Sequence, residues 1–451
     1  MPTWDRRTPD QQAKVRDAAL RRQLRDAVGP FSPFWRDRFS ALRVPAASIK
    51  TAADLTKLPA VTERDVCPSG DPKEAAQLVL QATEAGFALH AYGPDLRKAM
   101  VRRVGGAAAY RKQVEAEVRP TTFHFAGRSL RYPVASTRND LDLVARAGAR
   151  AWSILGLTNA DVLVSAVPVE ASLDHLFLTY AALGAGAPAI FPGPERLADA
   201  VAVVPPTVVA VRPGDVALLD GVDLDGVTTV LLVGPADDGA REMVAELLPD
   251  AKVLGLWGPP EGRVLWAQCA ADSGWHTYPD LDHVELVDPE TGQPATDGGE
   301  VTVTQLGFRG SALLRWRTGD VVAGPIETGA CPSCGRTVPR VPAQVRSGTT
   351  AVTVRLGADG AEQTFDVRSV TAVLAGRDDL AEWQVEVSPS ARGGDGLYVL
   401  IAPTGDETEA AVGVYRDVRA AAGVTPSQVV VLTPEELAAR RGDGERVVLR
   451  R

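Results

Sequence analysis

The chain has 451 residues, of which 45% are apolar, and it carries a net charge of −9 with no basic block. A chain of this length can bury extensive cores, and at about 100 to 200 residues per domain it should form two or three domains. The acidic balance argues against a nucleic-acid surface, and the first residues lack the apolar core of a secretory signal. We therefore expect a globular, cytoplasmic protein that binds neither nucleic acid nor membrane.

The first predicted element is an amphipathic helix over residues 11–28, where apolar side chains recur at helical spacing until Gly29-Pro30. From about residue 161, short apolar runs alternate with segments long enough for a helix. Such runs, without polar alternation, are typical of strands buried on both faces of a parallel sheet. The sequence therefore predicts an α/β core. The runs are 161–168, 187–193, 206–215, 228–235 and 251–260.

Residues 284–316 follow another pattern, that of antiparallel strands with turn chemistry at 297–299. Nearer the C-terminus, period-two runs at 383–389 and 397–403 precede a predicted helix near 407–421. This combination fits a small, compact α+β domain.

The strongest local signal is the sequence Cys-Pro-Ser-Cys-Gly at 331–335, because such a knuckle directs two thiolates to one centre. Cys269 and His276 best supply two further ligands, and a Cys3His set is a usual structural zinc site. His283 is an alternative to His276, and Cys67 is the spare cysteine. The competing interpretation is a set of reduced cysteines beside a surface histidine. Four protein ligands leave no position for water, so we expect zinc to have a structural role.

The predicted zinc ligands are Cys269, His276, Cys331 and Cys334. The ion would clamp the antiparallel section, near residues 265–340, inside a large N-terminal domain over residues 1–345. The small C-terminal domain would comprise residues 346–451.

With this cluster in view, the chain resembles the phenylacetate-CoA ligase family of adenylate-forming enzymes, from about residue 34 to its end. The order and spacing of several segments together are specific. The resemblance implies an acyl-CoA synthetase-like α/β fold with a mobile C-terminal domain. It also implies activation of an aryl or acyl carboxylate by ATP and transfer of the acyl group to coenzyme A. The segments include FWRDRF (34–39), TRNDLDLVARAGARAWSILGL (137–157), GWHTYPDLDHVELVDPETGQ (274–293), LLRWRTGDVV (313–322) and CPSCGRTVPRV (331–341).

The resemblance assigns roles to five residues. Asp320 matches the carboxylate that binds both ribose hydroxyls, since a carboxylate can accept two hydrogen bonds. Trp257 and Glu261 match the aromatic residue beside adenine and the acid that serves Mg²⁺, with a core tryptophan and a solvated turn as the alternative. Arg346 lies near the hinge arginine that contacts ribose, although the acidic pair expected after it is missing. His175 lies on a helix that borders the acyl pocket, with a packing role as the alternative.

Two features of the family are missing. Where its phosphate loop should be, residues 123–141 read FHFAGRSLRYPVASTRNDL, which cannot form a nest of amides. The sequence SGTT, which opens such loops, occurs at 347–350 instead, and we interpret it as a coincidental turn. No lysine follows Lys252, and Asp443 stands about where the family has its adenylation lysine. The cations that could replace the lost charge are Arg128, Arg131 and Arg446.

Two hypotheses for function follow. The first is a divergent carboxylate-CoA ligase that uses ATP or AMP with Mg²⁺ and coenzyme A, and it comes first because the ribose and Mg²⁺ positions are retained together. The second is a relative that has lost adenylation and binds a ligand or partner, or that catalyses another acyl transfer in the same pocket. Under either hypothesis, the chain could form a homodimer.

Overall fold

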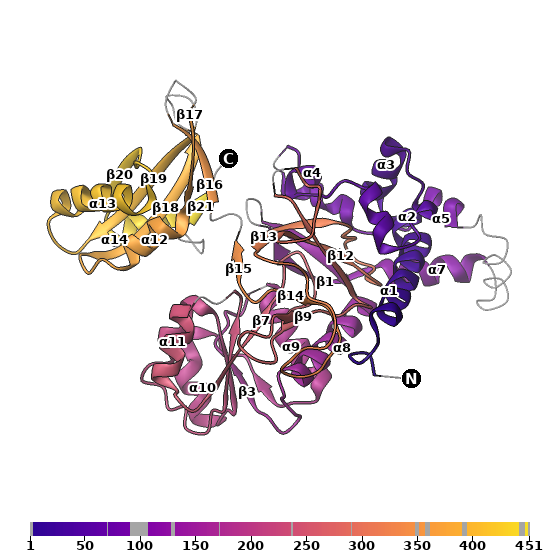
Figure 1. Ribbon diagram of the computed structural model, residues 1–451, viewed down its shortest axis with the longest axis horizontal. Helices are drawn as coiled ribbons and strands as arrows, with labels where there is room; N and C mark the ends of the chain where they lie inside the picture. The colour runs from indigo at the N-terminus through magenta and orange to yellow at the C-terminus, as the bar shows by residue number, and fades with distance from the viewer. Residues whose placement is uncertain are drawn as a thin grey trace. The chain divides into compact units, whose positions relative to one another are not determined.

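The computed structural model describes residues 3–69, 71–90, 107–127, 131–170, 172–235, 238–289, 291–347, 351–356, 361–389, 395–441 and 447–449. The chain divides into two compact units, Met1–Arg346 (unit 1) and Ser347–Arg451 (unit 2) (Figure 1). In these described ranges, no helix combines the length and the apolar character needed to cross a membrane.

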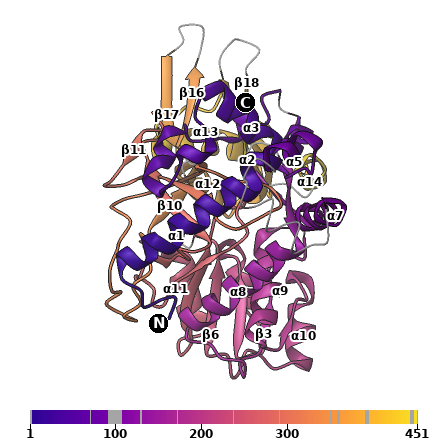
Figure 2. The ribbon, with the colours of Figure 1, turned by 90° about the vertical axis from the view of Figure 1, so that its right-hand side faces the viewer.

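Unit 1 begins with a helical region whose longest helix, α1, lies along the surface in Figure 2. Thr8 and Gln11 form a reciprocal cap at the start of α1, and a π-helical turn extends the helix to Val28. This confirms the predicted helix over 11–28. The elements are α1 (Pro9–Gln23), η1 (Leu24–Val28), α2 (Gly29–Phe31), α3 (Pro33–Leu42), η2 (Ala46–Ser48), η3 (Ala52–Lys57), α4 (Glu63–Val66), η4 (Pro72–Leu78), α5 (Glu84–His90) and α7 (Ala107–Val118).

An eight-stranded sheet of order β14-β9-β8-β7-β6-β5-β3-β4 forms the centre of unit 1. Strands β3 to β7 are parallel, and each lies in one of the five predicted apolar runs, which confirms the α/β prediction. The last three strands join by antiparallel pairing. The strands are β3 (Leu163–Ser165), β4 (Ala189–Ile190), β5 (Val208–Val211), β6 (Thr229–Val233), β7 (Lys252–Trp257), β8 (Trp266–Ala267), β9 (Trp275–His276) and β14 (Arg340–Val341).

Helices cover both faces of this sheet, α8 and α9 on one side and α10 and α11 on the other (Figures 1 and 2). Successive residues of β6 face opposite ways: Leu231 and Val233 belong to the core with α8 and α9, whereas Val230 and Leu232 belong to the core with α10 and α11. Because helices cover both faces of the sheet, each strand needs apolar side chains on both faces. Its sequence therefore does not alternate between apolar and polar residues. The helical elements are α8 (Arg138–Ile154), α9 (Leu173–Ala185), η5 (Pro194–Arg196), α10 (Leu197–Val203), η6 (Pro213–Leu219) and α11 (Asp238–Leu247).

A second sheet in unit 1 has the order β11-β10-β12-β13-β15, and the pairing of β10, β11, β12 and β13 is antiparallel, as predicted. A separate antiparallel hairpin, β1–β2, leads into α8. The strands are β1 (Pro120–Ala126), β2 (Tyr132–Thr137), β10 (Asp282–Val287), β11 (Pro294–Ala295), β12 (Gly299–Gln305), β13 (Trp316–Val322) and β15 (Val345–Ser347).

Unit 2 has a four-stranded sheet of order β20-β19-β18-β21 and a separate hairpin, β16–β17. Its main core includes residues of α12, α13, β18 and β19, and a smaller core lies between α14 and the sheet. The elements are β16 (Ala351–Leu356), β17 (Ala361–Asp366), α12 (Val367–Ala375), β18 (Leu380–Pro389), β19 (Asp395–Pro403), α13 (Glu407–Ala422), β20 (Gln428–Val431), α14 (Pro434–Arg441) and β21 (Val447–Leu449).

Candidate functional site

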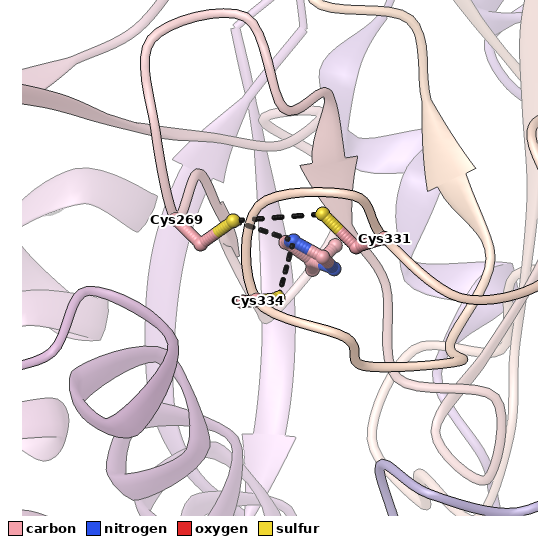
Figure 3. A group of neighbouring side chains, drawn as sticks. Cys269, Cys331 and Cys334 are labelled. Atoms are coloured by element: carbon pink, nitrogen blue, oxygen red, sulfur yellow. Dashed lines mark hydrogen bonds between the residues drawn. The ribbon is translucent and has the colours of Figure 1, made fainter.

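Four side chains from three segments of unit 1 form a candidate metal centre (Figure 3). Cys269 follows β8 and His276 ends β9, and the pairing of these strands brings the two residues together. His276 also pairs with Arg340 of β14, and the loop that leads into β14 carries Cys331 and Cys334. The sheet therefore assembles the cluster from residues far apart in the chain.

The distances within the cluster suit a tetrahedral ion. Sγ of Cys269 lies 3.7 Å from Sγ of Cys331 and 3.3 Å from Nε2 of His276, which lies 3.7 Å from Sγ of Cys334. All four ligand atoms lie within 4.8 Å of one another. Zinc bonds of about 2.3 Å to sulfur and about 2.0 Å to nitrogen place tetrahedral ligands roughly 3.5 to 3.8 Å apart. The cluster can therefore hold an ion of this kind.

The electrostatics of the cluster also suit a metal. Burial, with nearby arginines, lowers the pKa of His276 to about 3, so its imidazole is neutral and Nε2 can coordinate. Burial raises the pKa of Cys269 to about 12, and a bound cation would displace that proton. Burial opposes ionisation of Cys331 as well, but amides of the knuckle donate to its sulfur and lower its pKa overall.

The alternative ligand and the spare cysteine lie elsewhere. Nε2 of His283 is 3.6 Å from Glu285 and is not among the four clustered atoms. Cys67 is 2% exposed in the core formed by the N-terminal helices.

The knuckle also holds the N-terminal segment of the chain. Arg6 donates to the carbonyl of Gly335 at 2.5 Å, and the carboxylate of Asp5 accepts from Nε of Arg336 at 3.0 Å. The amide of Thr337 donates to the carbonyl of Asp5 at 2.9 Å. Nothing in the local sequence of residues 3–12 points to this docking, because it depends on partners more than 300 positions away.

The predicted nucleotide residues are buried in unit 1. Trp257 is 3% exposed, and its ring packs against Trp266 and Trp275 with centroid distances of 5.2 and 5.6 Å. This is the packing expected of a core tryptophan, and contact with adenine stays a prediction. Asp320 lies within β13, where the register of the ladder with β12 shifts, and it is 2% exposed. Its amide donates to Oγ1 of Thr318 at 3.1 Å.

Glu261 is 2% exposed, so the alternative of a solvated turn is wrong. Burial and, next, the negative charge of Glu261 raise the pKa of Tyr132 in β2, which places the carboxylate near the β1–β2 hairpin. Pro260, the residue before Glu261, contacts the same hairpin. Its carbonyl oxygen lies 2.9 Å from Nε2 of His124 in β1. A Mg²⁺ role for Glu261 stays a prediction.

The β1–β2 hairpin occupies the place expected of a phosphate loop. Phe125 pairs with Pro133 and Ala126 pairs with Tyr132, so the backbone on both sides of the connection belongs to a ladder. The connection itself is 127–131, of which 128–130, including Arg128, lie outside the described residues. The described ends of the connection therefore lead directly into strands rather than into a broad nest.

Some residues named from the sequence lie outside the described part of the chain. Arg446 and Asp443 lie outside the described residues, as do residues 348–350 of the SGTT sequence. Arg346 lies in β15, next to β13 in the five-stranded sheet. The roles predicted for them stay predictions.

A further group of side chains lies at the carboxyl edge of the parallel sheet, and we call it the switch-point site. The chain runs from β3 to β4 on one side of β3 and then crosses to β5 on the other side. Open α/β sheets bind ligands beyond the carboxyl ends of the strands at such a reversal. The residues of the switch-point site are Glu170, Asp174, His175, Phe191 and Arg212, which follow β3, β4 and β5.

Charged contacts join the switch-point site to the hairpin. Nη2 of Arg212 lies 2.7 Å from Glu170, and Nε of Arg212 lies 3.4 Å from Asp174. Arg131, at the end of the hairpin connection, reaches Glu170 at 3.2 Å. The ring of His175 meets Phe191 edge-on at a centroid distance of 5.5 Å. Sequence reasoning missed Glu170, Asp174 and Arg212, although Glu170 and Asp174 follow the predicted run 161–168 and Arg212 lies near the end of the run 206–215.

Comparisons with known proteins identify the fold. No protein-family model matches the chain, and no curated protein matches its sequence. A structure of 2-hydroxyisobutyryl-CoA ligase in the postadenylation state with 2-HIB-AMP superposes with a TM-score of 0.67 and 18% identity, covering 100% of this chain and 92% of that one. The same ligase with R3-HIB-AMP gives a TM-score of 0.66 and 17% identity with the same coverage. An ATP-bound RpMatB-BxBclM chimera gives 0.50 and 17%, covering 87% and 82% of the two chains. The chain therefore has the fold of adenylate-forming ligases, which confirms the predicted fold class.

Proposed function

We propose that the chain is a ligase that activates an aryl or acyl carboxylic acid with ATP and Mg²⁺ and transfers the acyl group to coenzyme A. The observation that carries this proposal is the likeness over the whole chain to a CoA ligase whose structures contain 2-HIB-AMP and coenzyme A. A kinship with the phenylacetate-CoA ligase family in particular rests on the sequence segments given above.

The proposed reaction has two steps. A carboxylate oxygen attacks the α-phosphorus of ATP, the bond to the β-phosphate breaks, and pyrophosphate leaves. The sulfur of coenzyme A then attacks the acyl carbon and loses its proton, and AMP leaves with the bonding electrons. We assign Asp320 to the ribose, Glu261 to Mg²⁺ and Trp257 to the adenine.

Arginines would supply the positive charge that this chemistry needs at the phosphates. Arg131 is the described candidate, since it sits at the end of the hairpin connection with 59% of its side chain exposed. Arg128 and Arg446 are further candidates from the sequence. Arginine is always charged but planar, so it can neutralise phosphate without reproducing the point charge of a lysine.

A second candidate function is a ligand-binding protein that has lost adenylation. The β1–β2 hairpin favours it, because its ladder uses backbone groups that a phosphate-binding nest would have to present. The absence of lysine beyond Lys252 favours it as well.

We also propose that the Cys3His cluster holds a structural Zn²⁺, with Cys269, His276, Cys331 and Cys334 as its ligands. Its ligand spacing and the neutral imidazole of His276 support this assignment. The knuckle then fixes residues 3–12 through Asp5 and Arg6.

The test of the ligase proposal is product formation by the purified chain with a panel of acids, ATP, Mg²⁺ and coenzyme A. Mass spectrometry should find AMP and an acyl thioester in equal amounts with at least one acid. Nucleotide binding without either product for any acid would favour the second candidate.

A further inference from the structure

The switch-point site carries an unusual balance of charge. Arg212 is shared by two carboxylates, Glu170 at 2.7 Å and Asp174 at 3.4 Å, so this inner trio has a net charge of −1. Arg131 adds a positive charge next to this trio. Of the three residues it contacts only Glu170, and 59% of its side chain is exposed. Asp174 therefore has the longer of the two contacts with Arg212 and no contact with Arg131 among the described ion pairs.

Asp174 is recessed but can still be reached. Its side chain is 28% exposed, yet the protein around it displaces enough water to raise its pKa despite the neighbouring Arg212. Glu170 behaves differently: burial disfavours its charge, but Arg212 and Arg131 outweigh that effect and lower its pKa. Asp174 is thus the carboxylate in this site whose charge the protein stabilises least, and a cation bound there would supply what is missing.

Two aromatic rings also belong to the switch-point site. His175 is next to Asp174 in the chain and Phe191 directly follows β4, and the two partly exposed rings meet edge-on at a centroid distance of 5.5 Å. Nδ1 of His175 is buried and has no hydrogen-bond partner among the described residues. An apolar or aromatic body can pack on such rings while a polar group reaches the carboxylates.

We infer that the switch-point site recognises a carboxylic acid that also carries a basic amine, with the ammonium group bound by Asp174 and the body of the acid beside His175 and Phe191. The inference rests on the proposed function in taking the bound acid to be the substrate. It narrows the aryl or acyl acids of that proposal to the amine-bearing ones.

An acid with a second carboxylate is the main competitor, because Arg212 could bind it. Nη2 and Nε of Arg212 already contact Glu170 and Asp174. A second ligand carboxylate on Arg212 would therefore lie beside both negative charges. The geometry therefore favours a cation.

The experiment compares acids that differ in charge at the end remote from the carboxylate. One set is 5-aminopentanoate, pentanoate and glutarate, and the other is 4-(aminomethyl)benzoate, 4-methylbenzoate and terephthalate. Binding of each acid to the full chain is measured by titration calorimetry. We expect at least one amine-bearing acid to bind about tenfold or more tightly than its neutral counterpart, because coupling between close charge pairs at binding interfaces is commonly of this size or larger.

Asp174→Asn should abolish this preference, so that the amine-bearing acid and its neutral counterpart bind with equal affinity. Asp199→Asn is the matched control, because Asp199 lies on α10 with 79% of its side chain exposed and should leave the preference intact. Glu170→Gln provides a second variant if the melting temperature shows that Asp174→Asn is unstable, and it should weaken the preference.

The inference is overturned if neutral acids or diacids bind as well as the amine-bearing ones, if no acid of either set binds, or if the preference survives both variants. Product formation separates this result from the proposed function. Equal formation of thioester from pentanoate and 5-aminopentanoate would overturn this inference but not the ligase proposal. An amine preference that depends on Asp174, without formation of any thioester, would overturn the ligase proposal but not this inference.

Discussion

Replacing Asp282 by asparagine should remove a pH-dependent loss of stability from unit 1. Asp282 lies in β10 with 2% exposure, and its Oδ2 accepts a hydrogen bond from Nε1 of Trp266 at 2.8 Å. Its Oδ1 is buried without a hydrogen-bond partner in the part of the chain that the structure describes. Burial raises the pKa of Asp282 to about 7, and the charge of Asp280 adds to this effect.

The sign follows from comparing the folded and unfolded states. An unfolded aspartate has a pKa of about 3.9, so between that value and about 7 the folded protein holds a proton that the unfolded chain has lost. The contribution to stability is therefore greatest in acid and is lost as the pH rises toward 7. Between pH 5 and pH 7 the loss amounts to about 2 kcal/mol. Asparagine has no such proton, so its contribution stays constant.

Urea unfolding at pH 5, 6 and 7 measures this effect. The free energy of unfolding of the wild type should fall by about 2 kcal/mol relative to that of Asp282→Asn over this range. Groups present in both proteins cancel, including His124, whose pKa burial lowers to about 4. Parallel curves for the two proteins would refute the reasoning. The result bears on the site, because Trp266 packs directly on Trp257.

Three further predictions concern the metal, the nucleotide and the fold. Metal analysis should find about one Zn per chain, and Cys334→Ser should lose it whereas Cys67→Ser should not; a stable, metal-free wild type would end the zinc proposal. Asp320→Ala should weaken ATP binding by about tenfold or more through loss of charged hydrogen bonds, and unchanged calorimetric affinity would remove its ribose role. Gly148→Ala should destabilise unit 1 by about 1 to 3 kcal/mol in denaturant unfolding, because its Cβ would lie 2.3 Å from a backbone atom of α9. Gly214→Ala, with open space around it, should change stability little, and equal effects of the two substitutions would contradict the packing argument.

The α/β core could be predicted because its physical cause is local. Strands covered on both faces need continuous apolar runs, and runs such as 206–215 and 228–235 stand out for that reason. The Cys3His cluster could be predicted because the knuckle at 331–335 is itself a dense pattern, and His276 has a cysteine seven positions before it.

The rest of the site depends on contacts that no local pattern records. Arg212 and Glu170 are 42 positions apart and meet only because β3 and β5 are neighbours in the sheet. The alternative of a solvated turn for Glu261 arose because its neighbours, Pro259-Pro260 and Gly262, are typical of an exposed turn, whereas Glu261 is buried. That turn is instead held against β1 through His124. Topology, rather than composition, decides which of these groups face one another.

The most direct test of the central claim is ATP-dependent exchange of pyrophosphate, because it isolates the first chemical step from the transfer to coenzyme A. The assay uses the full chain with its metal retained, Mg²⁺, and the two sets of acids above. The account predicts exchange that depends on the acid, is strongest with an amine-bearing acid and falls sharply in Asp320→Ala. Absence of exchange with every acid, while ATP still raises the melting temperature of the wild type, would contradict the claim that this chain activates acids.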